Sequence, residues 1–413
     1  MTISDDTHSS HSGYSTYRWI ILGGVWLSYF GFGLTAVTLA PLVTQISTDM
    51  NLSNSEIGTV MGAWQLIYIG SAIPCGILLE RLGARKALLL AFIIIAISCA
   101  LRGIATNYLS LFLAVAIFGL GGPLVSIGAP KVISLWFEGK DRAFAMGIYV
   151  TGMALGGMAG LSLTHSIMMP LLNDNWRHVL FAYSGFVFVT AFVWVGITAS
   201  GTFKAHEKNH HKQNHESQLT TFLDLIRIPS VCIVLLMGIG IFFFGHGLNN
   251  WLPEILVSHG MDSVTAGFWA SGPTLVGIVA SLIIPRLATP QFRMKILCGL
   301  FVSAFLATIF LQTADNEMLI FAVILQGVAK GAMMTIVILI LLDMKEVSSG
   351  RTGLAGGLFF STAEIGGVLG PVTIGVLSDY TGGFAASLWM LSGICISLLI
   401  LLSCLHFTRK QVC

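Results

Sequence analysis

The stretch GILLERLGARK, residues 76–86, lies between two long apolar segments at about 55–79 and 87–105. It places one acid and three bases close to two glycines. A transmembrane helix needs about 20 mostly apolar residues, which each flanking segment supplies. The stretch therefore predicts a short charged turn between two membrane-spanning helices, whose acid and bases can pair with helix ends at the membrane surface. Taken alone, it also fits an ordinary basic loop on the cytoplasmic side.

Apolar segments of this kind recur along the whole chain. Of its 413 residues, 55% are hydrophobic and 10% are charged, whereas soluble domains contain about 25% charged residues. The mean hydropathy is +0.85. We therefore predict an all-α integral membrane protein. Its twelve transmembrane helices are expected at about 18–44, 55–79, 87–105, 108–136, 143–170, 179–200, 230–256, 264–287, 294–312, 317–342, 351–378 and 384–407.

Basic residues are concentrated on one side of the predicted membrane. With the N-terminus in the cytoplasm, the cytoplasmic segments hold 17 of the 21 lysines and arginines. The external loops hold Arg102 and Arg177, while Lys131 and Lys330 lie within spans. Because cytoplasmic loops carry an excess of basic residues, both termini are expected in the cytoplasm.

The two halves of the chain repeat each other. FGFGL at 30–34 recurs as FGHGL at 244–248, and Ser-Gly at 184–185 recurs at 392–393. The glycines of span five recur with the same spacing in span eleven: Gly147, Gly156, Gly157 and Gly160 match Gly357, Gly366, Gly367 and Gly370. Matches six helices apart preserve orientation and indicate parallel repeats. Glycines at this spacing also let helices pack closely in lipid.

The repeat defines the domain organisation. We predict a cytoplasmic tail at 1–17, six-helix bundles at 18–200 and 229–408, a cytoplasmic linker at 201–228 and a tail at 409–413. The linker contains four histidines without regular ligand spacing, His206, His210, His211 and His215. The seven cysteines form no CxxC. We therefore expect neither a metal site nor a cofactor.

The stretch 76–86 resembles the signature loop of the major facilitator superfamily, G-x-L-x-D-R-x-G-x-R-[R/K], with Glu80 in place of the usual aspartate. Two other loops are similar to that family, Trp136-Phe137 before Lys140 and Arg142, and the sequence at 175–177. The resemblance implies a transporter that works by alternating access, usually as a monomer. It also implies a cytoplasmic gate formed by Gly76, Glu80, Arg81, Gly83, Arg85, Lys86 and Arg142.

A second resemblance concerns one branch of this superfamily. NWLPE at 250–254 and the run 327–343 look like the cyanate-permease-like porters. That branch implies small, often anionic solutes, and it includes proposed exporters of neutral nitro-compounds. Span four lacks the arginine of many members near Val115 and Ala116, and span five lacks the glycine-proline pattern of many drug/proton antiporters. Drug or neutral-compound efflux stays open as an alternative, as does a receptor without transport.

Four titratable residues lie deep within spans: Lys131, His246, Lys330 and Glu364. Charges at mid-bilayer are costly and usually mark a pathway. Lys131 is near enough to a helix end to reach the interface. We expect Lys330, with His246, to attract an anion and Glu364 to take up and release a proton. The alternative is an ion pair between Lys330 and Glu364 that only joins two helices.

The superfamily resemblance implies that spans one, four, seven and ten line the substrate path. The expected substrate-binding residues are Thr35, Gln65, Tyr68, Lys131, His246, Asn249, Asn250, Trp251 and Lys330. The function expected is a secondary transporter, a proton-coupled symporter of a small anion, in the cell membrane (the inner membrane of a bacterium). The sequence contains no HExxH, GxSxG or phosphate-binding loop and no basic patch with interleaved aromatics, so we expect neither an enzyme nor a nucleic-acid partner.

Overall fold

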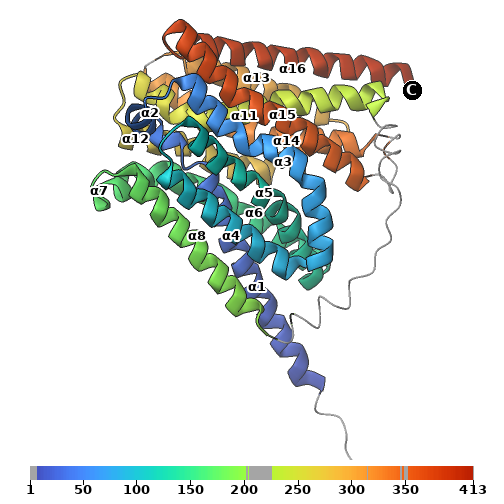
Figure 1. The fold of residues 1–413 in the computed structure, drawn as a ribbon. Coiled ribbons are helices and arrows are strands. Elements are labelled where there is room, and N and C mark those ends of the chain that lie inside the picture. Colours follow the sequence, from blue (N-terminus) through green and yellow to red (C-terminus); the bar gives the residue numbers. More distant parts are fainter. Residues whose placement is uncertain are drawn as a thin grey trace, which may run out of the picture.

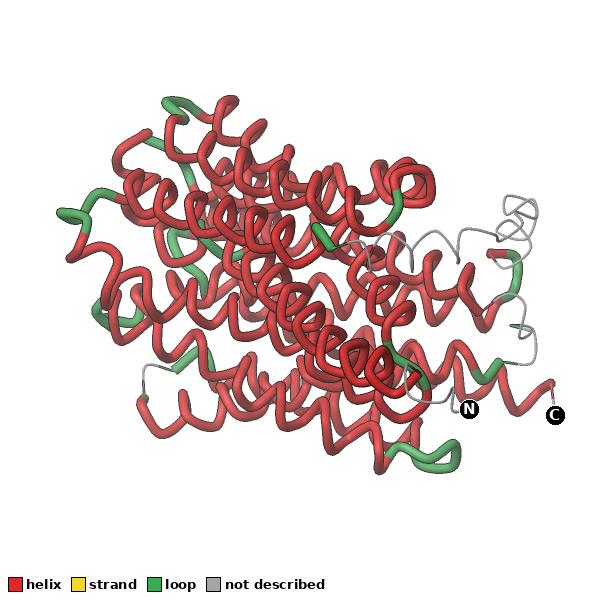
Figure 2. Tube along the Cα trace, turned by 90° about the horizontal axis from the view of Figure 1, so that it is seen from below, coloured by secondary structure: helices red, strands yellow, loops and turns green. Residues whose placement is uncertain are grey.

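The computed structural model describes residues 7–200, 203, 226–313, 315–344, 347 and 352–412, and this part of the chain forms helices without strands. Twelve helical segments are long and apolar enough to cross a membrane, which confirms the predicted fold class. Their bounds differ from the expected ones by a few residues. Figure 2 shows how short the loops between them are. The four linker histidines lie outside the described residues.

The first half runs from α1 to α8. Its elements are α1 (Thr7–Ala36), the 3₁₀ turn η1 (Ala40–Leu42), α2 (Val43–Met50), α3 (Asn54–Leu82), α4 (Ala84–Ile104), α5 (Tyr108–Trp136), α6 (Gly139–Leu163), the π-helical η2 (Thr164–Met168), α7 (Met169–Leu171) and α8 (Trp176–Thr198). The second half consists of α11 (Pro229–Ser258), α12 (Ser263–Leu287), α13 (Arg293–Phe310), α14 (Asn316–Leu342), α15 (Thr352–Thr381) and α16 (Ala385–Val412).

Side-chain caps begin the helices that enter from the external side. Ser53 and Glu56 form a capping box at α3, and Asn107 caps α5 in the same way with Ser110. In the second half, Asp262 accepts hydrogen bonds from the first N–H groups of α12. These caps satisfy donors that a helix leaves unpaired at its start. The short polar breaks in the sequence are therefore the signals that start these spans.

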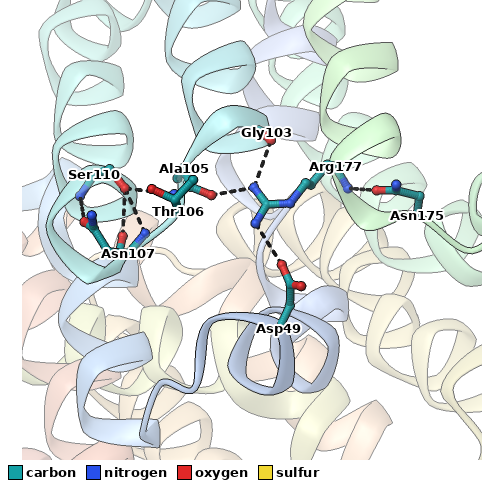
Figure 3. A network of polar contacts seen from close by, with 8 residues as sticks. All are labelled: Asp49, Gly103, Ala105, Thr106, Asn107, Ser110, Asn175 and Arg177. Carbon is teal, nitrogen blue, oxygen red and sulfur yellow. Dashed lines mark hydrogen bonds and ion pairs between the residues drawn. The ribbon is translucent and has the colours of Figure 1, made fainter.

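Two external arginines stabilise helix ends in different ways. Arg177 forms an ion pair with Asp49 (2.8 Å) and donates to the carbonyl oxygens of Gly103 and Ala105 at the end of α4 (Figure 3). Arg102, expected in an external loop, instead lies buried in the last turn of α4. It donates to the carbonyl oxygen of Thr35 at the end of α1 (2.8 Å). A cation suits that position because helix C-termini carry unpaired carbonyls and partial negative charge.

Glycines mediate the same close helix contact in both halves. A Cβ on Gly156 of α6 would lie 2.0 Å from the carbonyl oxygen of Phe30 on α1, and one on Gly370 of α15 would lie 2.4 Å from that of Phe243 on α11. Gly366, the sequence match of Gly156, makes the same kind of contact, because a Cβ on it would lie 1.9 Å from the carbonyl oxygen of Ile239 on α11. Small residues at this spacing therefore bring the two helix backbones together in each half.

The two halves meet at their external ends. Between them, α3 packs along α15 and α6 along α12. Among described residues, every hydrogen bond between the halves lies between the external surface and mid-membrane, joining Thr44 to Glu254, Asn54 and Ser55 to the end of α15, and Gln65 to His246. Toward the cytoplasmic ends the halves diverge, as α1 and α16 show in Figure 1. The interface between the two halves is therefore closed on the external side of the membrane.

Candidate functional site

Polar side chains from both halves meet at mid-membrane. Gln65 of α3 and His246 of α11 approach to 3.3 Å between Nε2 and Nδ1. An amide nitrogen can only donate, so Nδ1 of His246 is the acceptor in this arrangement. The other amide atom of Gln65, Oε1, is buried and has no hydrogen-bond partner in the described part of the chain. The site therefore joins the halves and still contains an unsatisfied acceptor.

Glu364 of α15 lies beside this pair. Its side chain is 7% exposed, and its Oε2 is buried without a hydrogen-bond donor among the described residues. A Cβ on Gly367 would lie 2.6 Å from Oε2, 3.2 Å from Cγ of Gln65 and 3.4 Å from Cδ2 of His246. Only a glycine leaves this point free, so the three side chains line one small space. An ionised carboxylate without a donor at this depth is costly unless a proton or a cation neutralises it.

Lys330 of α14 places an ammonium group near this cluster. Its Nζ donates a hydrogen bond of 2.8 Å to Oδ1 of Asn249, which follows His246 by three residues on α11. No ion pair joins Lys330 to Glu364, although the structure describes both residues. The alternative of a permanent structural pair is therefore not the arrangement observed. Lys330 is held by a neutral amide rather than by a carboxylate.

The first half contributes aromatic and hydroxyl groups. Tyr68 shares a hydrogen bond of 2.8 Å with Ser126 of α5, and its ring stands edge-on to Trp64 with 6.3 Å between centroids. The ring of Trp64 stands edge-on to the His246 imidazole, with 5.9 Å between centroids. Ser126 was not among the residues expected, because a single serine in an apolar span gives no sequence signal.

Four expected residues lie elsewhere or serve other contacts. Thr35 is fully buried, and its hydroxyl donates to the carbonyl oxygen of Gly31 within α1. Trp251 is fully buried and donates from Nε1 to the carbonyl oxygen of Pro371, so it joins α11 to α15. Asn250 donates to the backbone of His246 one turn earlier. Lys131 is partly buried, and its ammonium makes no hydrogen bond or ion pair within the described residues.

The expected cytoplasmic gate residues lie at the open end of the first half. Gly83 adopts a φ of 78°, which only glycine accepts readily, and joins α3 to α4. Arg85 donates to Thr198 of α8 (3.0 Å), and Arg142 donates to the carbonyl oxygens of Ser134 and Phe137 at the end of α5. The remaining members differ in exposure: Glu80, Arg81 and Lys86 are exposed and Gly76 is partly buried.

Known proteins similar to this chain are transporters. The family model described as Major Facilitator Superfamily matches residues 25–322. The "Probable galactarate/D-glucarate transporter GudP" of Escherichia coli is 25% identical, over 90% of this chain and 89% of that protein. The "Quinolone resistance transporter" of Acinetobacter baumannii is 25% identical over 84% of each. The "Nitrite extrusion protein" of Bacillus subtilis is 22% identical over 91% of each.

Solved structures support the same fold. The nucleoside transporter NupG superposes with a TM-score of 0.77 at 12% identity, covering 94% of this chain and 99% of NupG. Together with the family match and the twelve membrane-length helices, this places the chain in the cell membrane as a multi-pass protein. The chain belongs to the major facilitator superfamily, whose members include secondary transporters of small solutes.

Proposed function

We propose that this secondary transporter carries a small anion together with a proton, as a symporter. The observation that supports it most directly is the mid-membrane cluster of one cation, Lys330, held by Asn249, and one carboxylate, Glu364, without a hydrogen-bond donor among the described residues. Charged groups at this depth are retained where they serve a pathway. Gln65 and His246 connect that cluster across the two halves.

Lys330 binds the anionic group of the substrate in this proposal. Its ammonium has three donors, and the observed contact with Asn249 uses one of them. An anion beside it gains a charge-assisted hydrogen bond in a medium of low dielectric constant. Tyr68, Ser126 and Gln65 are neutral groups suited to hydroxyl or carbonyl oxygens of an organic anion.

Glu364 carries the proton. With Lys330 charged and Glu364 ionised, an entering monoanion would leave the cluster with a net negative charge. Protonation of Glu364 restores neutrality, and uncompensated charge in a dry site is strongly unfavourable. One proton per monoanion is therefore the expected stoichiometry.

The names of the relatives point to anions and also to one different class. Galactarate, D-glucarate and nitrite are anions, and they favour the proposal. The quinolone relative is as similar in sequence as the galactarate relative. Aromatic rings around His246, those of Trp64 and Phe242, could also contact a planar drug. Drug efflux is therefore the second candidate.

Proton flux in proteoliposomes with an internal pH-sensitive dye tests the proposal. Galactarate, D-glucarate, nitrite and a quinolone are each supplied outside, and wild type is compared with Glu364→Gln. The proposal expects anion-dependent acidification in the wild type and its loss in Glu364→Gln, with exchange of radiolabelled anion retained. Acidification that survives in Glu364→Gln would contradict the role of this carboxylate. Alkalinisation with the quinolone alone would favour a drug antiporter.

A further inference from the structure

Four hydrogen bonds join the external end of α15 to the start of α3 in the other half. The carboxylate of Asp379 accepts from the backbone N–H groups of Asn54 (3.0 Å) and Ser55 (2.7 Å), and from the hydroxyl of Ser55. Next to it, Nδ2 of Asn54 donates to the hydroxyl of Ser378 (3.0 Å). These residues are more than 320 positions apart in sequence.

α3 does not need Asp379 in order to begin. Ser53 accepts from the N–H of Glu56, and Glu56 accepts from the N–H of Ser53, so α3 carries its own capping box. Asp379 takes the N–H groups of Asn54 and Ser55, which this box leaves unpaired. A carboxylate is well suited to them because helix N-termini carry partial positive charge. The contact therefore adds a link between the halves at a helix start that already has a cap of its own.

The backbones approach closely at the same place. A Cβ on Gly375 would lie 2.2 Å from the carbonyl oxygen of Asn54, and one on Gly58 would lie 2.5 Å from that of Pro371. Glycine on each helix therefore brings the carboxylate of Asp379 within reach of the α3 N-terminus.

The sequence around Asp379 repeats the pattern at the opposite end of α3. G-x-L-x-[D/E]-x-x-G occurs at 76–83, with Glu80 as its acid, and at 375–382, with Asp379 in the same position. The last glycines, Gly83 and Gly382, have φ of 78° and 73°, so each pattern ends on a glycine at positive φ. One pattern ends α3 at the cytoplasmic surface and the other ends α15 at the external surface.

We propose that Asp379 is the latch of the external gate. It holds α3 against α15 while the external side is closed, and it releases the N-terminus of α3 when that side opens. The proposal rests on alternating access between the halves, but its test reads conformation without any solute. A failure to find the transported solute would therefore leave the test of the latch intact.

Double electron–electron resonance between spin labels tests the latch in detergent or nanodiscs. In a background with the seven native cysteines replaced by serine, one label pair is placed at the exposed external positions Thr106 and Thr313. A second pair is placed at the exposed cytoplasmic positions Lys140 and Gln291. Asp379→Asn is expected to shift the ratio of externally open to externally closed molecules about tenfold, as expected for loss of charge-assisted hydrogen bonds. The external distance lengthens and the cytoplasmic distance shortens.

Asp262→Asn is the matched control, because Asp262 also caps an external helix start but within its own half. It is expected to leave both distance distributions as in the wild type. Asn54→Pro provides a second variant at the first helical position, where proline is tolerated. It removes the backbone N–H that donates to Asp379 and the side-chain amide that donates to Ser378. It should shift both distances as Asp379→Asn does. Unchanged distances in both latch variants, or an equal shift in Asp262→Asn, would overturn the proposal.

Discussion

Phe32 in the first half and His246 in the second hold corresponding positions in the repeated sequences FGFGL and FGHGL. Both rings stand edge-on to Trp64, with centroids 6.4 Å and 5.9 Å from it, but only His246 also pairs with Gln65. Lys330 lies 208 positions after Gly122, the offset that also separates Ser-Gly at 184–185 from Ser-Gly at 392–393. A Cβ on Gly122 would lie 2.9 Å from the ring of Tyr68. In the first half the ring of Tyr68 packs against Gly122, whereas the matching position of the second half carries the ammonium group of Lys330.

The two halves share their helix-packing contacts but differ in their titratable side chains. The glycine contacts of α6 with α1 and of α15 with α11 are equivalent, because both bundles must bring backbones together in lipid. At mid-membrane the second half carries a histidine, a lysine and a carboxylate, and the first half mostly supplies neutral partners. Substitutions can test each side of the comparison.

The largest loss of folded protein is expected at the glycine contacts that both halves share. Gly156→Val and Gly370→Val each place a side chain against a backbone oxygen that cannot move aside. Such overpacking typically costs about 1–3 kcal/mol and occasionally more, and because the clash here is with backbone, neither variant should yield monodisperse protein on size-exclusion chromatography. Gly147→Val and Gly357→Val are the controls, since a Cβ at either position meets no atom within 4 Å. Normal behaviour of Gly156→Val alone would show that the two bundles do not depend on this contact equally.

The next effect separates the deep lysines of the two halves. Lys330→Ala is expected to lower anion uptake into proteoliposomes by about 100-fold or more, as expected for loss of a buried charged contact to the substrate. Lys131→Ala is expected to retain uptake within a few-fold, because Lys131 has no polar partner among the described residues. Equal losses of uptake in both variants would indicate that the anion site extends to Lys131, near the cytoplasmic end of α5.

A smaller effect distinguishes the two helix-capping arginines of the first half. Arg102→Gln removes a buried donor to the end of α1 and is expected to destabilise the protein by about 1–3 kcal/mol. Arg177→Gln breaks a partly exposed ion pair worth about 1 kcal/mol or less, and it removes donors to the carbonyl oxygens of Gly103 and Ala105, which are closer to water than the buried contact of Arg102. Thermal unfolding in detergent should therefore give a larger drop in Tm for Arg102→Gln. A larger drop in Tm for Arg177→Gln would mean that the C-terminal end of α1 is not stabilised by Arg102.

The sequence alone determined the number of spans, their orientation and the existence of the repeat. Hydropathy over about 20 residues is a local property that decides whether a segment enters lipid, and lysine and arginine counts are equally local. The sequence also singled out Gln65, His246, Asn249, Lys330 and Glu364 as deep polar residues.

Tertiary structure decided which of these residues meet. Lys330 bonds Asn249 and forms no ion pair with Glu364, Gln65 reaches His246 across the halves, and Asp379 reaches the start of α3. Each contact depends on how helices far apart in sequence are rotated and tilted against each other. Those angles are set by packing with neighbouring helices, to which a hydropathy pattern within one span is insensitive.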